Sequence, residues 1–209
     1  MSAIHSKSAL VYAQVRRALQ SGRYLPGQRI DPASLAAEFR TSPTPVRFAL
    51  YRLVGAGLLA DHARNGLHVP LPTEVALRDL YDWMQRLLLM ACDIGVAATA
   101  ARPQEVLPEC GGADVVKMTW QLFDTIAGTT GHRCLHHAVR RANDRLAPIR
   151  HAKQYLLENA GEELLELRRH WRERDMAALG AAVRGYHERR LQHVPRIVAM
   201  LNDGRDSIR

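Results

Sequence analysis

The sequence predicts a mostly α chain in two parts, a small N-terminal domain that carries a β-hairpin and a larger all-α helical bundle. Three observations lead to this fold class. Apolar residues recur at helical spacing over most of the 209 residues. Two short extended runs flank an Asn-Gly pair at residues 65 and 66, and the pattern changes after Pro70 and Pro72. We therefore expect one domain over residues 1–72 and a second over residues 73–209.

Two helices are predicted in the first forty residues. In residues 8–21 the apolar side chains fall close to every 3.6 positions, and Gly22 supplies a stop. After a Pro-Gly turn, Asp31 is expected to cap a short helix through Phe39, with Pro32 at the first helical position.

The stretch TSPTPVRFALYRLVGAGLL, residues 41–59, predicts a third helix with a rigid start. Thr44 is expected to cap it, and Pro45 at the first helical position forfeits no hydrogen bond. The periodicity predicts a buried stripe of Val46, Leu50, Leu53 and Val54. It leaves a second set of side chains toward solvent: Thr44, Arg47, Tyr51 and Arg52.

A hairpin is predicted after the third helix. The segment LLADHARNGLHVPLP reads as two short strands around residues 63–66, and Asn65-Gly66 is a common hairpin turn. Helix, helix, turn, helix and hairpin is the order of a winged helix-turn-helix with a small β-hairpin wing.

The charge distribution favours an anionic partner for the first domain. Residues 1–72 contain nine Lys and Arg against three Asp and Glu, a net charge of +6, whereas the other 137 residues carry +2. Neutralising DNA phosphates needs positive charge only on the contacting face. The alternative is a solvated basic surface without a partner.

The remaining chain predicts an all-α bundle. Helices are expected over Thr73 to Ala101, Ala113 to Gly128, Cys134 to Asn159 and Glu162 to Leu201, where long Ala- and Leu-rich stretches have helical period. The longest apolar run, residues 87–92, is too short to span a bilayer, and the first ten residues lack the apolar segment of a secretory signal. We expect a cytoplasmic protein.

The three cysteines do not predict a disulfide framework or a metal knuckle. Cys92, Cys110 and Cys134 are odd in number and widely spaced. We expect these cysteines to be buried or incidental thiols without a functional site.

Several of these segments together resemble the GntR family of bacterial transcription regulators, in the branch with an all-helical ligand-binding domain typified by the fatty-acid regulator and the vanillate regulator. The matching motifs are SGRYLPGQRI (21–30), SLAAEF (34–39), TSPTPVRFALYRLVGAGLL (41–59) and NGLHV (65–69). The bundle matches more loosely, mainly through helix order and the run RERDMAALGAAVRGYHERR (172–190).

The resemblance implies a homodimer that binds a near-palindromic double-stranded DNA operator, most often as a repressor controlled by a small-molecule effector. The third helix would enter the major groove and the hairpin tip the minor groove. Amides and hydroxyls at the helix start favour phosphate, and Arg47 can reach a base edge or a phosphate. The expected DNA-binding residues are Ser42, Thr44, Arg47, Tyr51, Arg52, Arg64, Asn65 and Gly66.

Two residues depart from the family pattern Ser-Arg-Thr-Pro-Val-Arg at this site. Pro43 stands where the first arginine is usual, so a guanidinium expected to contact DNA is missing. Phe48 stands where an acidic residue is common. We expect Phe48 to contact the other domain or the dimer partner rather than a base.

Many members of this branch bind a divalent metal through an Asp and three His, and here the matching positions are Trp120, Asp124, Leu164 and Tyr186. One carboxylate among such neighbours should not hold a transition metal, so no metal and no cofactor is expected. Met84 and Leu88 replace an Arg and a Glu that often line the effector pocket. Together with Trp83, which is a further candidate for the lining, these seven residues predict a pocket more apolar than usual.

The histidine-rich bundle leaves a rival reading, a helical metal-binding protein or metalloenzyme that uses relocated histidines. His132 and His136 are four residues apart, and His187 is offset by one from the last ligand position. One residue rotates a side chain by about 100° on a helix, so His187 would not replace that ligand. A nonspecific DNA-packaging protein is a third reading, which the defined third helix argues against.

Two further groups of residues were weighed for function. Glu162, Glu163 and Glu166 stand three or four residues before arginines, which predicts exposed helix ion pairs rather than catalysis. The tryptophans at 83, 120 and 171 lie in apolar helical contexts and are expected in the core, with Trp83 and Trp120 able to line an effector cavity. We therefore expect no enzyme.

Overall fold

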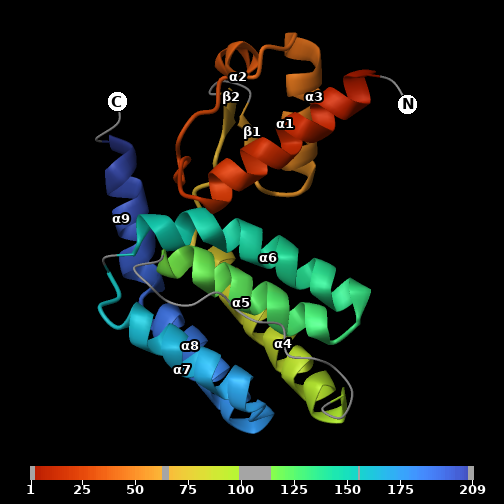
Figure 1. Cartoon of the computed structure of the whole chain (residues 1–209). Coiled ribbons are helices and arrows are strands. Elements are labelled where there is room, and N and C mark those ends of the chain that lie inside the picture. Colours follow the sequence, from red (N-terminus) through yellow and green to blue (C-terminus); the bar gives the residue numbers. More distant parts are fainter. Residues whose placement is uncertain (1–2, 63–65, 99–113, 155, 207–209) are drawn as a thin grey trace. The chain divides into compact units, whose positions relative to one another are not determined.

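The computed structural model describes residues 3–62, 66–98, 114–154 and 156–206 (Figure 1). The described residues contain nine helices and one two-stranded antiparallel sheet, which confirms the predicted fold class. No helix in this part of the chain is both long enough and apolar enough to cross a membrane.

The chain divides into two compact units. The first comprises Met1–Leu71 together with Ala147–Ala152 and Met200–Arg209, and the second comprises Pro72–Leu146 and Lys153–Ala199. Because the first unit takes in two later segments, the expected single boundary between residues 72 and 73 stays a prediction.

The first two helices form where the sequence predicts them. α1 (Ala3–Gln20) starts five residues before the predicted Ser8, buries Val11, Val15 and Leu19, and is followed by Gly22 at a φ of 74°. α2 (Pro32–Glu38) is capped by Asp31, whose Oδ2 accepts hydrogen bonds from the Ser34 amide at 2.9 Å and the Ser34 hydroxyl at 2.7 Å. The capping prediction at Asp31 is confirmed.

α3 (Pro43–Gly55) begins two residues earlier than predicted. Its N-cap is Ser42, in an extended conformation, and Pro43 rather than Pro45 is the first helical residue. Thr44 is therefore not the cap. The fixed φ of proline suits this first position, and Pro45 also falls in the first turn, where amides lack partners within the helix.

The core of the first unit gathers under α3. Val46, Leu50 and Leu53 have no exposed surface, as predicted, whereas Val54 is half-buried. α1, α2 and the strands contribute the other buried side chains: Val11, Val15, Leu19, Ile30, Leu35, Ala36, Leu58, Leu59, Leu67 and Val69. This packing fixes the orientation of α3 and leaves its opposite side to solvent.

The predicted hairpin is present after α3. β1 (Ala60–His62) pairs antiparallel with β2 (Gly66–His68), with Asp61 opposite Leu67. A third segment joins the wing, because Arg29 bridges His68 and the Ile30 amide donates to the Leu67 carbonyl at 2.8 Å. The wing is thus tied to the chain that precedes α2.

The second unit is built largely of helices, and their boundaries correct two predictions. The helices are α4 (Glu74–Ala98), α5 (Val115–Thr129), α6 (Arg133–Ala152), α7 (Ala160–Glu173), α8 (Met176–Gln192) and α9 (Val194–Asp206). α6 ends seven residues before the predicted Asn159. The single helix predicted from Glu162 to Leu201 is three helices.

The breaks between α7, α8 and α9 have local causes. Arg174 adopts a left-handed conformation with a φ of 57°, and the carboxylate of Asp175 then caps α8 by accepting from the Ala178 amide at 2.9 Å. α8 ends at His193, whose carbonyl accepts the first hydrogen bond of α9 from Ile197. These breaks leave the apolar period nearly unchanged, so periodicity alone did not reveal them.

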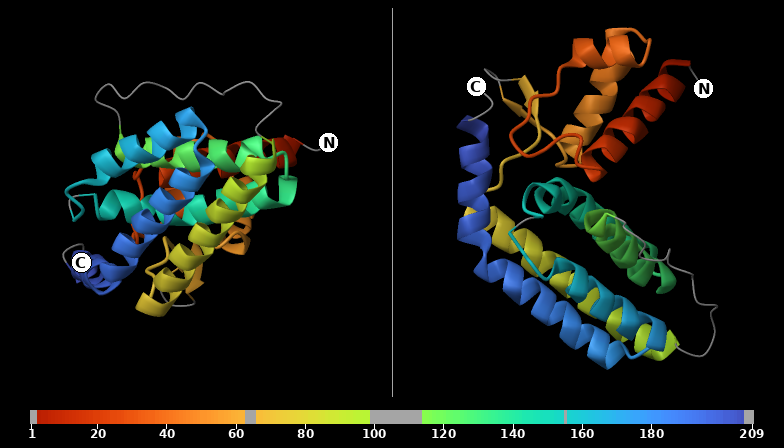
Figure 2. Two further views of the ribbon diagram at one scale, coloured as in Figure 1. Left: turned by 90° about the horizontal axis from the view of Figure 1, so that it is seen from below. Right: turned by 60° about the vertical axis from the view of Figure 1, so that its left-hand side comes forward.

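The bundle core lies between α4, α5 and α8. α4 and α8 run side by side, as both views of Figure 2 show. Their facing side chains are fully or almost fully buried: Leu77, Tyr81, Met84 and Leu88 of α4, Leu122, Phe123 and Ile126 of α5, and Leu179, Val183, Tyr186 and His187 of α8.

Candidate nucleic-acid interface and the interior of the bundle

The exposed side of α3 carries the side chains that the sequence predicts for it. Ser42, Thr44, Arg47, Tyr51 and Arg52 are all exposed, Tyr51 to 56%. They project from the side opposite the buried stripe, so the rigid packing of α3 holds them in one array. Such an array on a helix of 13 residues has the size and shape that a DNA major groove admits.

The two arginines of α3 differ in their surroundings. The Arg52 guanidinium lies over the Tyr12 ring of α1, 4.5 Å from its centroid, which holds it against the domain. Arg47 has no hydrogen-bond or ion-pair partner among the described residues. Arg47 is therefore the freer of the two cations to meet an anionic partner.

The start of α3 offers fewer amides than the sequence motif implied. Pro43 and Pro45 have no N–H, so among the first three helical residues only Thr44 presents an amide. The Ser42 side chain makes no capping hydrogen bond. Hydroxyls of Ser42 and Thr44, more than backbone amides, are the donors at this end.

Phe48 is also exposed, to 59%. It stands four residues after Thr44 and four before Arg52, so it shares their side of α3. An exposed apolar side chain among polar neighbours marks a surface that contacts something else. The sequence analysis did not count Phe48 among the solvent-facing residues of this helix, although its spacing of four residues from Thr44 and Arg52 could have placed it there.

The wing contributes a cation that the sequence analysis missed. Gly66 has a φ of 68°, a conformation that favours glycine, and a Cβ built on it would lie 3.8 Å from Arg29 Nε. The exposed Arg29 side chain thus flanks the hairpin. Only the pairing of residue 29 with residue 68 brings it there, and no local motif encodes that pairing. The predicted contacts Arg64 and Asn65 lie outside the described residues.

In the bundle, four of the predicted pocket residues are buried. Met84 and Leu88 are fully buried, and Leu164 and Tyr186 are 3% exposed. The ring of Tyr186 packs edge-on against Phe123, with centroids 5.5 Å apart. These apolar side chains occupy the interior of the bundle.

Trp83 does not belong to that interior. It is 50% exposed, so the expectation that it lies in the core is wrong, and its place in the lining of an effector cavity stays a prediction. It stands two residues after the buried Tyr81, about 200° further around the helix, so it faces away from Tyr81. Trp120 is half-buried and donates from Nε1 to Asp144 Oδ1 at 3.0 Å, and Trp171 is also half-buried.

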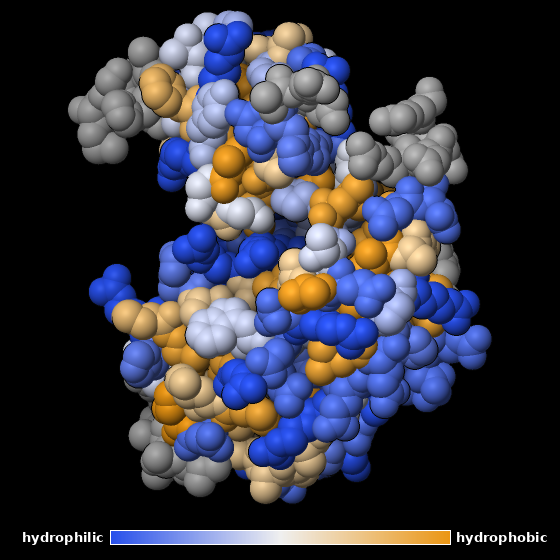
Figure 3. All heavy atoms as spheres, turned by 180° about the vertical axis from the view of Figure 1, so that it is seen from behind, coloured by the Kyte–Doolittle hydropathy of each residue, from blue (hydrophilic) through white to orange (hydrophobic). Residues whose placement is uncertain are grey.

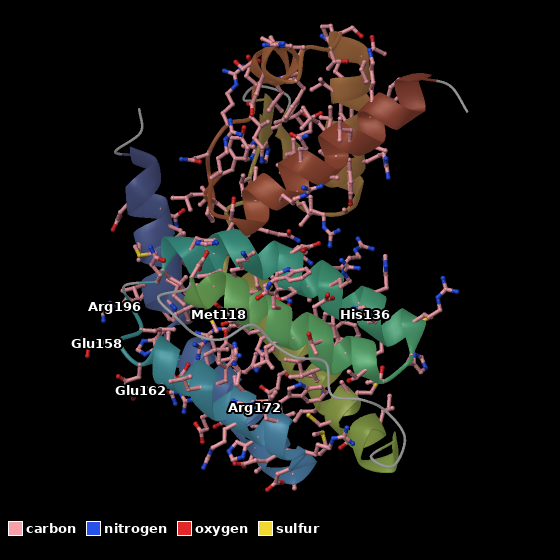
Figure 4. All side chains as sticks on the ribbon, viewed as in Figure 1. Met118, His136, Glu158, Glu162, Arg172 and Arg196 are labelled. Atoms are coloured by element: carbon pink, nitrogen blue, oxygen red, sulfur yellow. The ribbon has the colours of Figure 1, made fainter. Side chains whose placement is uncertain are left out.

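Asp124, the one carboxylate kept at a family metal position, is engaged by α6. Its Oδ1 lies 2.7 Å from His136 Nε2 and 3.3 Å from Arg140 Nε (Figure 4). Trp120, Leu164 and Tyr186 offer no imidazole in place of the family's histidines. The residues present therefore do not fit a divalent transition metal.

The other histidines do not assemble a replacement site within the described residues. His132 precedes the first residue of α6, and its Nδ1 accepts from the Leu135 amide at 3.4 Å. His187 is fully buried, with Nδ1 2.8 Å from the Val183 carbonyl. Across the described residues no three His, Cys, Asp or Glu side chains converge.

A buried ion pair in the bundle was not foreseen. Glu163 Oε2 lies 2.5 Å from Arg190 Nη2, and the side chains are 10% and 3% exposed. Arg189 also pairs with Glu163. The exposed pairs predicted along α7 are thus wrong for Glu163, whose partners come from α8, whereas Glu162 stays exposed near the start of α7 (Figure 4).

The pair holds Arg190 charged beside Tyr186. Its guanidinium lies 3.3 Å from the Tyr186 ring centroid and donates to the Tyr186 carbonyl at 2.8 Å. Burial acts to lower the pKa of Arg190, but Tyr186 and Glu163 outweigh it, and the pKa is raised. A charged guanidinium, balanced by the carboxylate of Glu163, therefore borders the apolar interior.

The described cysteines fit the expected reading of unreactive or incidental thiols. Cys92 is buried, and burial raises the pKa of its thiol to about 12. Cys134 is exposed, and Cys110 lies outside the described residues.

Comparison with known families and curated proteins places the first domain. Residues 7–69 match the model of the bacterial regulatory proteins of the gntR family. The Nta operon transcriptional regulator of Aminobacter aminovorans is 27% identical over 136 residues, 60% of this chain and 65% of that protein. The uncharacterized HTH-type transcriptional regulator YdhC of Bacillus subtilis (strain 168) is 33% identical over 70 residues, 34% of this chain and 31% of that protein. The chain thus spans less than two thirds of either relative.

Solved structures extend the likeness of fold to the second unit. McbR/YncC of E. coli superposes with a TM-score of 0.68 and 18% identity, covering 94% of this chain and 99% of that one. A Rhodococcus sp. RHA1 protein named as a transcriptional regulator GntR superposes with a TM-score of 0.71 and 16% identity. The match covers 90% of this chain and 97% of that one. At these identities the structures show a shared fold.

Proposed function

Because residues 7–69 belong to the gntR family of bacterial regulatory proteins, we propose that the chain is a transcription regulator that binds double-stranded DNA. It acts as a homodimer on a near-palindromic operator and represses transcription there. The observation that carries the proposal is the exposed side of α3, where Arg47, without a hydrogen-bond or ion-pair partner among the described residues, stands on a helix whose other side is fully packed. The named regulators among its relatives support the same function.

On DNA, α3 enters the major groove. Arg47 reaches a base edge or a phosphate, Tyr51 and the Ser42 and Thr44 hydroxyls contact the backbone, and Arg52 stays anchored on Tyr12. The wing lies at the minor groove, where Gly66 permits close approach and Arg29 adds positive charge beside Arg64 and Asn65. Two such heads read the two halves of the operator.

Pro43 and Phe48 give this chain its own readout. Without the arginine usual at position 43, and with two amides of the first turn missing, the start of α3 holds phosphate more weakly. Phe48 is exposed on the same side, so in place of the contact with the other domain or the dimer partner that the sequence led us to expect, we propose an apolar contact of the kind that recognises a thymine methyl group. The operator therefore differs from those of relatives with the usual motif.

The bundle regulates by differential binding. An effector that prefers one arrangement of the helices shifts the spacing of the two heads and so the occupancy of the operator. Met84, Leu88, Leu164 and Tyr186 make the interior apolar, so we propose a largely apolar small molecule. The donor set around Asp124 gives that effector no metal to bind.

Selection from a random duplex library at physiological salt tests this function. We expect enrichment of a two-fold symmetric motif, and footprinting of the winning duplex should show protection at both halves. A library that yields no enriched sequence would rule out an operator-specific regulator. Enrichment of a single asymmetric site would rule out the symmetric dimer.

A further inference from the structure

α4 has a second apolar side that the bundle does not cover. Val75, Trp83 and Met90 are exposed to 68%, 50% and 51%. At about 100° per residue they lie within about 80° of one another around the helix, roughly opposite the buried Leu77 and Met84. Three large apolar side chains on one exposed helix side indicate a contact surface.

Charged residues of opposite sign lie between these apolar ones. Asp79 stands between Val75 and Trp83, and Arg86 stands between Trp83 and Met90. Along the helix the order is apolar, acidic, aromatic, basic, apolar. Read from Met90 back to Val75, the order is apolar, basic, aromatic, acidic, apolar, so the acid and the base change places.

That order is complementary to itself when two copies run antiparallel. With a two-fold axis between residues 82 and 83, Val75 of one copy meets Met90 of the other, and Asp79 meets Arg86. The two Trp83 rings then lie next to each other at the axis. Every contact in the set is apolar with apolar or acid with base.

We propose that this side of α4, defined by Val75, Asp79, Trp83, Arg86 and Met90 and called the α4 face, joins two copies of the chain. The proposal rests on the proposed function for its homodimer and adds the surface that forms it. Trp83 at the axis is the residue type that dominates interface energies, flanked on both sides by a charge pair.

The charges on α4 favour a second copy of the chain over DNA or an anionic lipid surface. Asp79 and Asp82 are exposed or half-exposed, Arg86 lies within 2.7 Å of Asp82, and the other exposed arginine, Arg78, pairs with Glu74. DNA and anionic lipid would both be repelled by these carboxylates. Apolar and hydrophilic residues are interspersed on the face seen from behind in Figure 3.

The size of the α4 face suits the centre of a dimer interface. The fifteen helical steps from Val75 to Met90 span about 22 Å of helix. α8 runs beside α4 and can extend the contact on one flank (Figure 2). A central aromatic pair with polar surroundings is the usual anatomy of such an interface.

Charge exchange between two variants tests the proposal. In a dimer of Asp79→Arg, arginine faces arginine at both of the contacts between residue 79 of one copy and residue 86 of the other. In a dimer of Arg86→Asp, aspartate faces aspartate at the same two contacts. Sedimentation equilibrium of the full chain should show the dissociation constant of each variant raised at least about 100-fold over that of the wild type. An equimolar mixture of the two restores both acid–base contacts and should form a heterodimer near the wild-type affinity.

Matched controls are available at exposed positions of α7, a helix outside the α4 face. Glu162→Arg and Arg169→Asp change the same charges at exposed positions and should leave the dimer unchanged. Far-ultraviolet circular dichroism checks that all variants are folded.

The results separate this inference from the proposed function. If the wild type is monomeric, if the single variants dimerise as well as the wild type, or if the mixture stays monomeric, the α4 face is not the dimer surface. Operator selection is scored independently. A wild type that selects an operator while dimerising elsewhere overturns the inference alone, and an α4 dimer that selects no operator overturns the function alone.

Discussion

At the scale of single residues, the Asp31 cap is set by chemistry that the sequence displays. The hydrogen bond from the Ser34 side chain, with those from nearby backbone amides, holds the pKa of Asp31 below its ordinary 3.8. The carboxylate therefore stabilises the fold above the unfolded-state pKa, and this stability is lost as the pH falls through the lowered folded-state pKa.

We predict that Asp31→Ala lowers the free energy of unfolding at pH 7, measured by urea denaturation, whereas Asp31→Asn retains most of it because asparagine also caps helices. The difference between Asp31→Ala and the wild type should shrink below pH 3.8. A difference that stays constant down to the lowest pH would contradict the role of the carboxylate.

Gly66 carries a backbone conformation that other residues adopt at a cost. Gly66→Ala should lower the stability of the domain by about 1–2 kcal/mol, because its φ is 68° while the Cβ itself would meet only ordinary contacts. Gly55→Ala is the matched control, since that residue ends α3 with no atom within 4 Å of the new Cβ. If urea denaturation finds the same loss of unfolding free energy in both variants, the positive φ of Gly66 is not what makes substitution at this position costly.

At the scale of elements, the start of α3 decides how strongly the helix holds DNA. Pro43→Arg restores a guanidinium and an amide at the first helical position, and we expect it to tighten binding to the selected operator about fivefold or more. Pro43→Ala restores the amide alone and should gain less. Fluorescence anisotropy titrations compare the three. An unchanged affinity for Pro43→Arg would show that position 43 does not face DNA.

The ion pair between α7 and α8 makes a second prediction at this scale. Glu163→Gln leaves the buried Arg190 without its carboxylate and should cost about 3–5 kcal/mol of stability. Adding Arg190→Met should recover much of that loss, because no uncompensated charge remains. Glu162→Gln, at an exposed position, should change stability by less than about 0.5 kcal/mol. Urea denaturation in which the double variant is as unstable as the sum of the singles would contradict a coupled pair.

The elements also show what the sequence could predict. The α1 stripe, the Asp31 cap and the Asn-Gly hairpin depend on residues within a few positions of one another, and they were predicted correctly. The start of α3 was misplaced by two residues because two prolines both satisfy the rules for a first turn. The break between α7 and α8 depends on the single left-handed residue Arg174 and on the cap that follows it, and the break between α8 and α9 falls at His193.

At the scale of the whole molecule, the missed features depend on pairings across the chain. Arg29 reaches the wing only through its bridge to His68, and Glu163 is buried because Arg190 of another helix meets it. Trp83 was misjudged because α4 is apolar on two sides, and periodicity does not distinguish a core side from a contact side. The binding residues on α3 remain predictions that rest on exposure and charge.

The central claim is that the exposed side of α3 reads DNA sequence through Arg47, and one competition experiment tests it most directly. Affinities of the wild type, Arg47→Ala and Arg169→Ala are measured for the selected operator and for random duplex at one salt concentration. We predict that Arg47→Ala loses about 1–3 kcal/mol of the preference for operator, while Arg169→Ala, changed on an exposed arginine of α7, keeps it in full. If Arg47→Ala keeps the full preference, α3 does not read the operator as proposed.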